Sequence, residues 1–191
     1  MSRLLKEFSE YWNFRPVRTM FFVRLLSYLS IYIAPFWGML LAIYFDAWDW
    51  DYLQKYNMPK HWYHRIDKVV DYVEYLILLP IMYFTPVFYW YLGFLLWRTI
   101  GTAWYFLADT KDSIFVFFPN MAEYIALFHF MSETFGLGWN VVSWQWLFGL
   151  LVYKTLVELQ LHYFKVMLPV ADKPQPALLR AFARFNQAII K

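Results

Sequence analysis

Long runs without charge constrain this chain more than any other feature. Residues 25–45 and 75–97 carry no charged side chain, and a helix of about 20 apolar residues can cross the roughly 30 Å hydrocarbon layer of a bilayer. Apolar residues make up 61% of the sequence and charged residues only 16%, which places the composition in the membrane class. The sequence therefore predicts an all-α integral membrane protein.

Two further runs bring the expected number of transmembrane helices to about four. Residues 139–153 are uncharged, and residues 113–131 are mostly apolar but contain two ionisable side chains. A span at 113–131 leaves both termini on one side with most of the Lys and Arg residues, as the positive-inside rule expects; a re-entrant segment is the alternative. The last helix is expected to continue past the membrane, with Lys154 and Glu158 on its exposed face.

The whole chain, residues 1–191, is expected to form a single membrane domain. Residues 1–19 are predicted to be an interfacial N-terminal segment, residues 20–168 the transmembrane bundle, and residues 169–191 a basic amphipathic tail. Another amphipathic interfacial helix is predicted from Lys60 onward in the first loop, because apolar and charged residues recur there at helical spacing.

Three ionisable side chains in or beside the third predicted span are the candidates for chemistry. They are Glu123, His129 and Glu133, and an ionisable group inside a bilayer is costly enough to indicate a function. One hypothesis is that they handle protons or a quinone. The other is that Glu123 hydrogen-bonds to Asn120 or another polar side chain and fixes helix packing. Glu123 does not share the helical face of His129 and Glu133, which favours the packing hypothesis.

Two clusters of possible metal ligands occur in the first loop: Asp46, Asp49 and Asp51, and His61, His64 and Asp67. The three aspartates lack the glycine and the distal glutamate of a calcium-binding EF-hand loop. The H-x-x-H pair occurs in a chain with four histidines in total, too few for the several histidine boxes of a membrane di-iron enzyme. We therefore expect no metal and no other cofactor, and a solvated turn at the aspartates.

Basic residues gather near both ends of the chain. Arg15, Arg18 and Arg24 precede the first predicted span, and Arg180 and Arg184 lie in the tail. Each basic residue near an anionic surface contributes about 1 kcal/mol of attraction. These five residues are predicted to bind anionic phospholipid such as cardiolipin.

The sequence contains no signature that indicates an enzyme. A Gly-rich phosphate loop, G-x-S-x-G and H-E-x-x-H are absent from the sequence, and without cysteine there is neither a disulfide nor a catalytic thiolate. Beyond the basic tail, nothing indicates nucleic-acid binding.

The sequence favours a non-catalytic structural or accessory subunit of a larger membrane protein complex. Such a subunit would stabilise assembly, bind anionic lipid and have other membrane subunits as partners. By composition alone, the expected setting is a respiratory or ATP-synthase assembly of the mitochondrial inner membrane. The alternative is a small integral-membrane enzyme, or a proton- or quinone-handling protein, that uses Glu123, His129 and Glu133.

Overall fold

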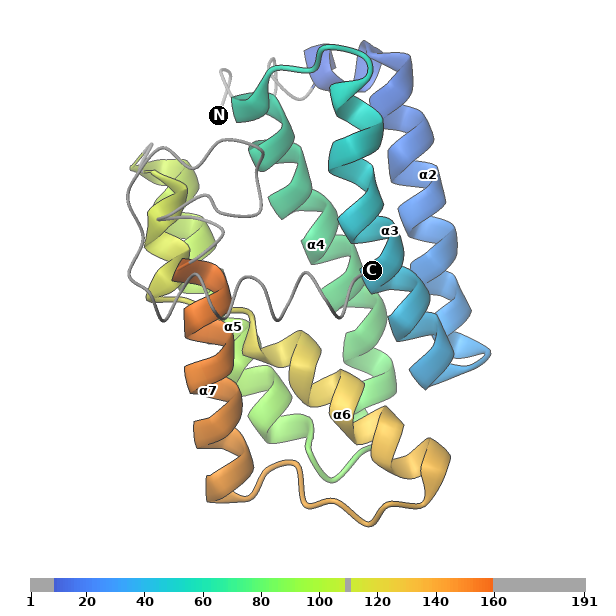
Figure 1. Ribbon diagram of the computed structural model, residues 1–191, viewed down its shortest axis with the longest axis vertical. Coiled ribbons are helices and arrows are strands. Elements are labelled where there is room, and N and C mark those ends of the chain that lie inside the picture. The colour runs from blue at the N-terminus through green and yellow to red at the C-terminus, as the bar shows by residue number, and fades with distance from the viewer. Residues whose placement is uncertain (1–8, 109–110, 160–191) are drawn as a thin grey trace. The chain divides into compact units, whose positions relative to one another are not determined.

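A computed structural model describes residues 9–108 and 111–159, and the regular structure of these residues is helical (Figure 1). In chain order the elements are α2 (Arg15–Leu29), the 3₁₀ helix η1 (Ser30–Tyr32), α3 (Pro35–Gln54), α4 (Lys60–Tyr83), α5 (Phe88–Leu107), the 3₁₀ helix η2 (Asp112–Val116), α6 (Met121–Phe135) and α7 (Trp144–Glu158). They group in two compact units. Of the described residues, unit 1 comprises 9–88 and 126–139, and unit 2 comprises 89–108, 111–125 and 140–159.

The prediction of an integral membrane protein is wrong. Among the helices in the described part of the chain, none is both long enough and apolar enough to cross a membrane. The prediction of about four transmembrane helices and the multi-pass localisation in a membrane are corrected by the same finding.

Proline residues explain why the two longest uncharged runs are not single helices. Residues 25–45 are divided among α2, η1 and α3, and Pro35 is the first residue of α3. Residues 75–97 are divided between α4 and α5 by a turn that contains Pro86. Proline fits the first turn of a helix, where its missing N–H group is not needed, but it interrupts a helix that is already running.

The other two predicted spans are also interrupted. Residues 113–131 are divided between η2 and α6, with Pro119 between these helices. In the run 139–153, α7 begins only at Trp144. The many Tyr and Trp side chains also have polar tips, so an uncharged run in this chain is less apolar than its lack of charge indicates.

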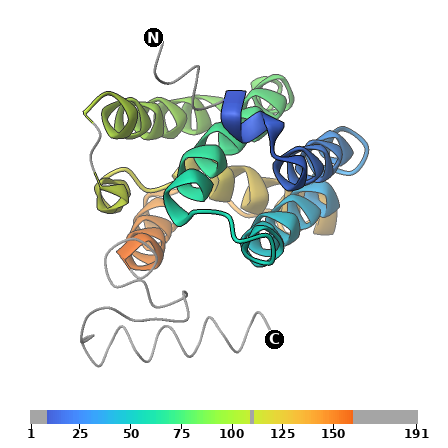
Figure 2. The same cartoon turned by 90° about the horizontal axis from the view of Figure 1, so that it is seen from above.

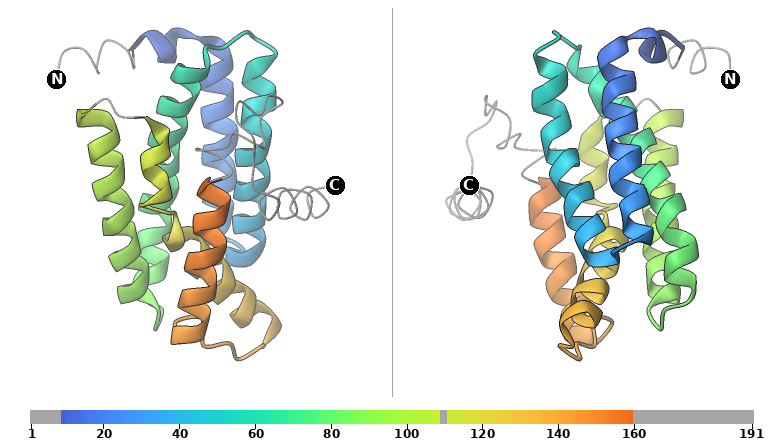
Figure 3. Two further views of the ribbon diagram at one scale, coloured as in Figure 1. Left: turned by 60° about the vertical axis from the view of Figure 1, so that its left-hand side comes forward. Right: turned by 90° about the vertical axis from the view of Figure 1, so that its right-hand side faces the viewer.

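Unit 1 is built around three long helices that lie side by side. Helix α2 packs against α3 and against α4, and the same neighbourhood is visible in Figures 2 and 3. Their shared core is apolar and includes Met20, Tyr28, Ala42 and Val70. Gly38 lets α3 approach the chain before it, since a Cβ atom there would lie 2.5 Å from the backbone nitrogen of Ile31.

Helices α3 and α4 place acidic residues differently from the sequence prediction. Helix α3 continues to Gln54, so the aspartates expected in a solvated turn are helical. Helix α4 begins at Lys60, as predicted, but it is not a surface helix: Asp67 and Lys68 are buried. Both helices therefore bring charged side chains into the interior of unit 1.

Unit 2 contains α5, η2, the first turn of α6, and α7. Helix α7 packs against η2, and Phe115 of η2 is fully buried. The segment between η2 and α6 packs closely on α5, because a Cβ atom at Gly101 would overlap the ring of Phe118.

Candidate functional site: a buried arginine–aspartate cluster

The interior of unit 1 holds a group of charged side chains that we call the Arg24 cluster. It comprises Arg24 from α2, Asp46 and Asp49 from α3, and Asp67, Lys68 and Asp71 from α4. Residues three or four positions apart lie on one face of a helix. The spacing of the aspartates on α3 and on α4 therefore directs each pair toward α2.

One half of the Arg24 guanidinium faces the middle of the cluster. Its Nη1 atom donates to Asp49 Oδ2 at 2.7 Å and to Asp67 Oδ1 at 3.1 Å. Its Nε atom donates to the Tyr28 hydroxyl oxygen at 2.6 Å, one turn along α2. The Asp49 carboxylate is held from its other side by the Tyr63 hydroxyl, which donates to Oδ1 at 2.7 Å.

The other half of the guanidinium faces the remaining two aspartates. Arg24 Nη2 lies 2.7 Å from Asp46 Oδ1 and 3.0 Å from Asp71 Oδ1. Lys68 Nζ contacts Asp67 Oδ2 at 2.8 Å and Asp71 Oδ2 at 3.3 Å. One arginine thus ties three helices together, and one lysine reinforces the two aspartates of α4.

Burial makes these contacts strong and their loss costly. Arg24 is 1% exposed and Asp49 is fully buried, whereas the Asp46 side chain is half exposed. Burial alone would lower the pKa of Arg24, but the surrounding carboxylates raise it well above its ordinary value. Burial would likewise raise the pKa of Asp67, yet Lys68 and Arg24 hold it well below its usual range. Both groups are therefore charged at neutral pH.

Asp49 differs from Asp67 in its response to the same surroundings. Its burial raises its pKa to about 7, although Arg24 opposes the rise, and the charge of Asp67 adds to it. Four carboxylates face two cations in the Arg24 cluster, so full ionisation leaves two negative charges in excess. Burial also raises the pKa of Asp46 well above its ordinary value, although Arg24 opposes the rise, so the two aspartates of α3 are the carboxylates that can take up a proton and reduce that excess.

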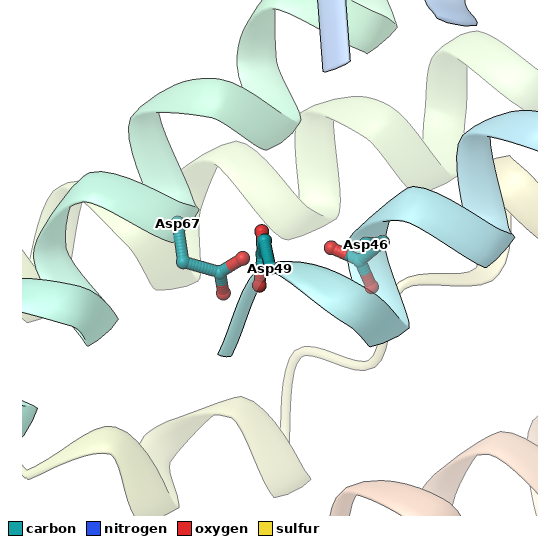
Figure 4. A group of neighbouring side chains, drawn as sticks. All are labelled: Asp46, Asp49 and Asp67. Atoms are coloured by element: carbon teal, nitrogen blue, oxygen red, sulfur yellow. The ribbon is translucent and has the colours of Figure 1, made fainter. Parts of the chain in front are cut away.

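Three of the carboxylates also have the spacing of a metal site. Oxygen atoms of Asp46, Asp49 and Asp67 lie within 4.8 Å of one another, and Figure 4 shows the carboxylates of α3 and α4 turned toward each other. The Arg24 guanidinium already contacts all three. The guanidinium is the positive charge that these three carboxylates share, and a metal ion would have to displace it.

A change of pH should reveal the raised pKa of Asp49. Its proton is held more tightly in the folded chain than in the unfolded chain, so the stability it provides is complete below about pH 4 and is lost as pH rises toward 7. The low pKa of Asp67 acts only below about pH 4, outside this window. In Asp49→Asn the neutral amide does not titrate, so between pH 4 and 7 the variant should lose roughly 2–4 kcal/mol less stability than the wild type.

The measurement is urea unfolding at several pH values. The change in the free energy of unfolding with pH is diagnostic, whereas its absolute value is not, since Asn provides one acceptor oxygen fewer than Asp. Asp51→Asn, at an exposed position of the same helix, is the matched control and should run parallel to the wild type. Parallel profiles for Asp49→Asn and the wild type would contradict the raised pKa.

Unit 2 has a second buried group, which we call the Arg98 cluster. Its members are Arg98 of α5, Asn120 and Glu123 at the start of α6, and Lys154 and Glu158 of α7. Arg98 Nη1 donates to the Phe118 carbonyl at 2.6 Å and lies 3.7 Å from Glu158 Oε1. Lys154 Nζ lies 3.8 Å from the same oxygen. Lys154 and Glu158, predicted on an exposed helical face, are buried, and that prediction is wrong.

Glu123 has a local structural role in this cluster. It lies in the first turn of α6, not in mid-span, and its Oε2 atom accepts a hydrogen bond of 2.6 Å from the Asn120 amide. The backbone N–H of Glu123 donates in return to Asn120 Oδ1 at 3.5 Å. Side-chain bonds of this kind satisfy free N–H groups at a helix start. The structure thus contains the Asn120 bond of the packing hypothesis.

His129 and Glu133 lie farther along α6 and do not form a site with Glu123. His129 is buried and Glu133 is exposed. Burial lowers the pKa of His129, although the charge of Glu133 opposes the shift. A buried histidine with a lowered pKa is neutral at pH 7.

The five arginines predicted to bind lipid lie in different surroundings. Arg15 and Arg18 are exposed on α2, whereas Arg24 is enclosed by carboxylates and is not available to a phosphate group. Arg180 and Arg184 lie outside the described residues. Binding of anionic phospholipid by the four other arginines stays a prediction.

The possible metal ligands predicted in the first loop do not all come together in the structure. Asp51 does not join the group that Asp46 and Asp49 form with Asp67. The His61 side chain lies outside the described part of the structure, and the half-buried His64 is not in that group either.

Comparison with protein families, with curated proteins and with solved structures finds no match. The functional argument therefore rests on the side chains and surfaces of this chain.

Proposed function

We propose that the chain is a non-catalytic accessory subunit, a helical scaffold within a larger protein assembly. The observation that carries this proposal is the amount of large apolar side chain on the outside of the helices. On α7, Trp144, Phe148, Leu151 and Val152 are exposed, and their spacing places them along one side of the helix. Monomeric soluble proteins rarely expose contiguous apolar patches of more than a few hundred Å².

Other helices show the same pattern. On α2, Phe22, Leu26 and Leu29 are exposed at intervals of four and three residues. On α3 the exposed residues include Trp37 and Tyr44, again two turns apart. Aromatic side chains provide much of the binding energy at protein interfaces, which supports protein partners for these surfaces.

The charged interior supports a structural role over a catalytic one. In the Arg24 cluster each carboxylate contacts a cation, and in the Arg98 cluster Glu158 lies between two cations. A hollow on α7 lined by Gln145, Trp146, Gly149 and Leu150 has a volume of about 260 Å³ and is open to solvent, below the roughly 300–1,000 Å³ of typical ligand pockets. The buried charges stabilise the scaffold and do not line this hollow.

The test is to isolate the tagged full chain from its native cells under mild conditions and to measure particle mass and subunit ratios. We expect a particle much heavier than one chain, with other proteins in fixed stoichiometry. Phe148→Arg should release the chain from this particle, because a charge in an apolar interface costs several kcal/mol, whereas Phe148→Leu should remain bound. A wild-type chain that is isolated alone would contradict the proposal.

A further inference from the structure

Helix α5 buries polar side chains and exposes apolar ones, the reverse of an ordinary surface helix. Its buried face carries Tyr91, Arg98, Thr102 and Tyr105. Its outer face carries large apolar side chains that helical geometry places on one side of the helix: Tyr89, Leu96, Trp97, Ile100, Trp104 and Leu107, with Trp90 at its edge. A helix in contact with water normally has its apolar face inward. The outer face of α5 therefore has the character of an interface.

No charge lies on this outer face. Arg98 is the one charged residue between Phe88 and Leu107, and it is 3% exposed. The helix extends for about 30 Å. In a two-fold contact, a face with a net charge repels its own copy, whereas an uncharged face has no such cost.

A glycine lies on the outer face, in the first third of α5. Gly93 is exposed, and a Cβ atom there would have nothing within 4 Å. By contrast, Gly101 on the inner face of the same helix makes room for Phe118. Glycine is less favourable than alanine inside a helix, and no neighbour among residues 9–108 and 111–159 explains it at Gly93. A second helix that crosses α5 there would explain it, because a small residue at a crossing point lets two backbones approach closely.

The exposed area matches what a stable dimer needs. Seven large side chains on the outer face are between 46% and 83% exposed. If each loses on the order of 100 Å² when covered, the helix can contribute up to roughly 700 Å² per copy when two copies run nearly parallel along it, close to the approximately 800 Å² per partner of a standard interface.

We propose that α5 is the self-association face of this protein, on which two copies pack helix against helix around a two-fold axis with Gly93 at the crossing. The inference rests on the proposed function in one respect, that exposed apolar surface is assembly surface, and it identifies the first partner as a second copy. Trp97 lies one turn from Gly93; its indole N–H donates to the Phe117 carbonyl at 3.0 Å and its ring packs on Phe118, so it is fixed at the edge of the outer face with its remaining surface exposed.

The absence of cysteine from the chain permits a clean cross-linking test. The purified full-length variant Gly93→Cys is treated with a short bifunctional maleimide, and Gly149→Cys is the matched control, since Gly149 is also an exposed helical glycine with nothing within 4 Å. We expect at least about 10-fold more covalent dimer from Gly93→Cys, because two thiols held at a crossing have a high effective concentration. Equal yields from the two variants would overturn the proposal.

Sedimentation provides an independent measurement. The wild type should be a dimer at about 10 μM, and Gly93→Arg should raise the dimer Kd by about 100-fold or more through its buried charge. Because Arg favours helix more than Gly, the variant should keep its helical circular dichroism. A wild type that stays monomeric would overturn self-association. If that chain is nevertheless isolated from cells in a particle with other proteins in fixed stoichiometry, the accessory-subunit proposal still stands.

Discussion

Replacing Arg24 by methionine is expected to lower the free energy of unfolding by about 3–5 kcal/mol. Methionine approximates the length of the arginine stem but removes the cation that Asp46, Asp49, Asp67 and Asp71 share; Lys68 of the Arg24 cluster contacts only Asp67 and Asp71 among these four in the described structure. Carboxylates that are buried without a counter-ion are strongly destabilising. The loss should be largest at neutral pH, since below about pH 4 protonation removes most of the unbalanced charge.

The measurement is urea unfolding combined with hydrogen exchange, which assigns the loss to particular helices. Arg18→Met, at an exposed position of α2, is the matched control and should change stability by less than about 0.5 kcal/mol. Arg24→Lys should fall between the two, because an ammonium is a point charge and cannot span carboxylates on two helices. A loss below about 1 kcal/mol in Arg24→Met would show that the cluster does not hold the three helices together.

The helical character of the chain could be predicted from its sequence because apolar residues recur at helical spacing, and the start of α4 at Lys60 followed from the same pattern. The interruptions could not be derived from hydropathy alone. Pro35 begins a helix, Pro86 lies in a turn, and Pro80 is accommodated inside α4. Which proline breaks a helix depends on whether neighbouring residues satisfy the freed backbone groups, and this is a property of the packed structure.

The Arg24 cluster left a signal in the sequence that was assigned to another role. Asp46 and Asp49 are three residues apart, and Asp67 and Asp71 are four apart, so each pair lies on one helical face. The sequence alone predicts solvent around the aspartates of α3 and a lipid surface at Arg24, so it gives no sign that these residues meet. The contacts between them join residues 25 to 47 positions apart, and local spacing cannot reveal such pairs.

The burial of charged side chains and the exposure of apolar side chains are related in this chain. In unit 2, Arg98 and Lys154 each lie within 4 Å of Glu158, so the interior uses the few charged residues of the chain as internal links. Apolar side chains that would ordinarily form the core are then left for the surface. A high apolar content is therefore compatible with a helical assembly subunit and does not by itself indicate a membrane span.

The second large effect is expected at Arg98, whose replacement by methionine should cost unit 2 about 2–4 kcal/mol. The guanidinium donates to the Phe118 carbonyl and lies over the Phe115 ring at 4.2 Å. Its loss removes one of two cations beside Glu158 and a donor to a buried carbonyl. The cost should be smaller than at Arg24, because Lys154 still faces the Glu158 carboxylate. Burial alone would lower the pKa of Lys154, but Tyr124 and Glu158 raise it above its ordinary value. Lys154 therefore stays charged.

A double-mutant cycle with Glu158→Gln separates the ion pair from packing. If Arg98 acts mainly through Glu158, the two losses should be less than additive, with a coupling of about 1–2 kcal/mol. If Arg98 acts mainly through the Phe118 carbonyl and the Phe115 ring, the losses should add within about 0.5 kcal/mol. Lys111→Met, at an exposed position before η2, serves as the control for removing a cation. The Arg98–Glu158 distance is 3.7 Å, longer than the 2.6 Å bond to the carbonyl, so we expect coupling near the lower end of this range. Additive losses would contradict a contribution from the ion pair and assign the effect of Arg98 to the carbonyl and the ring.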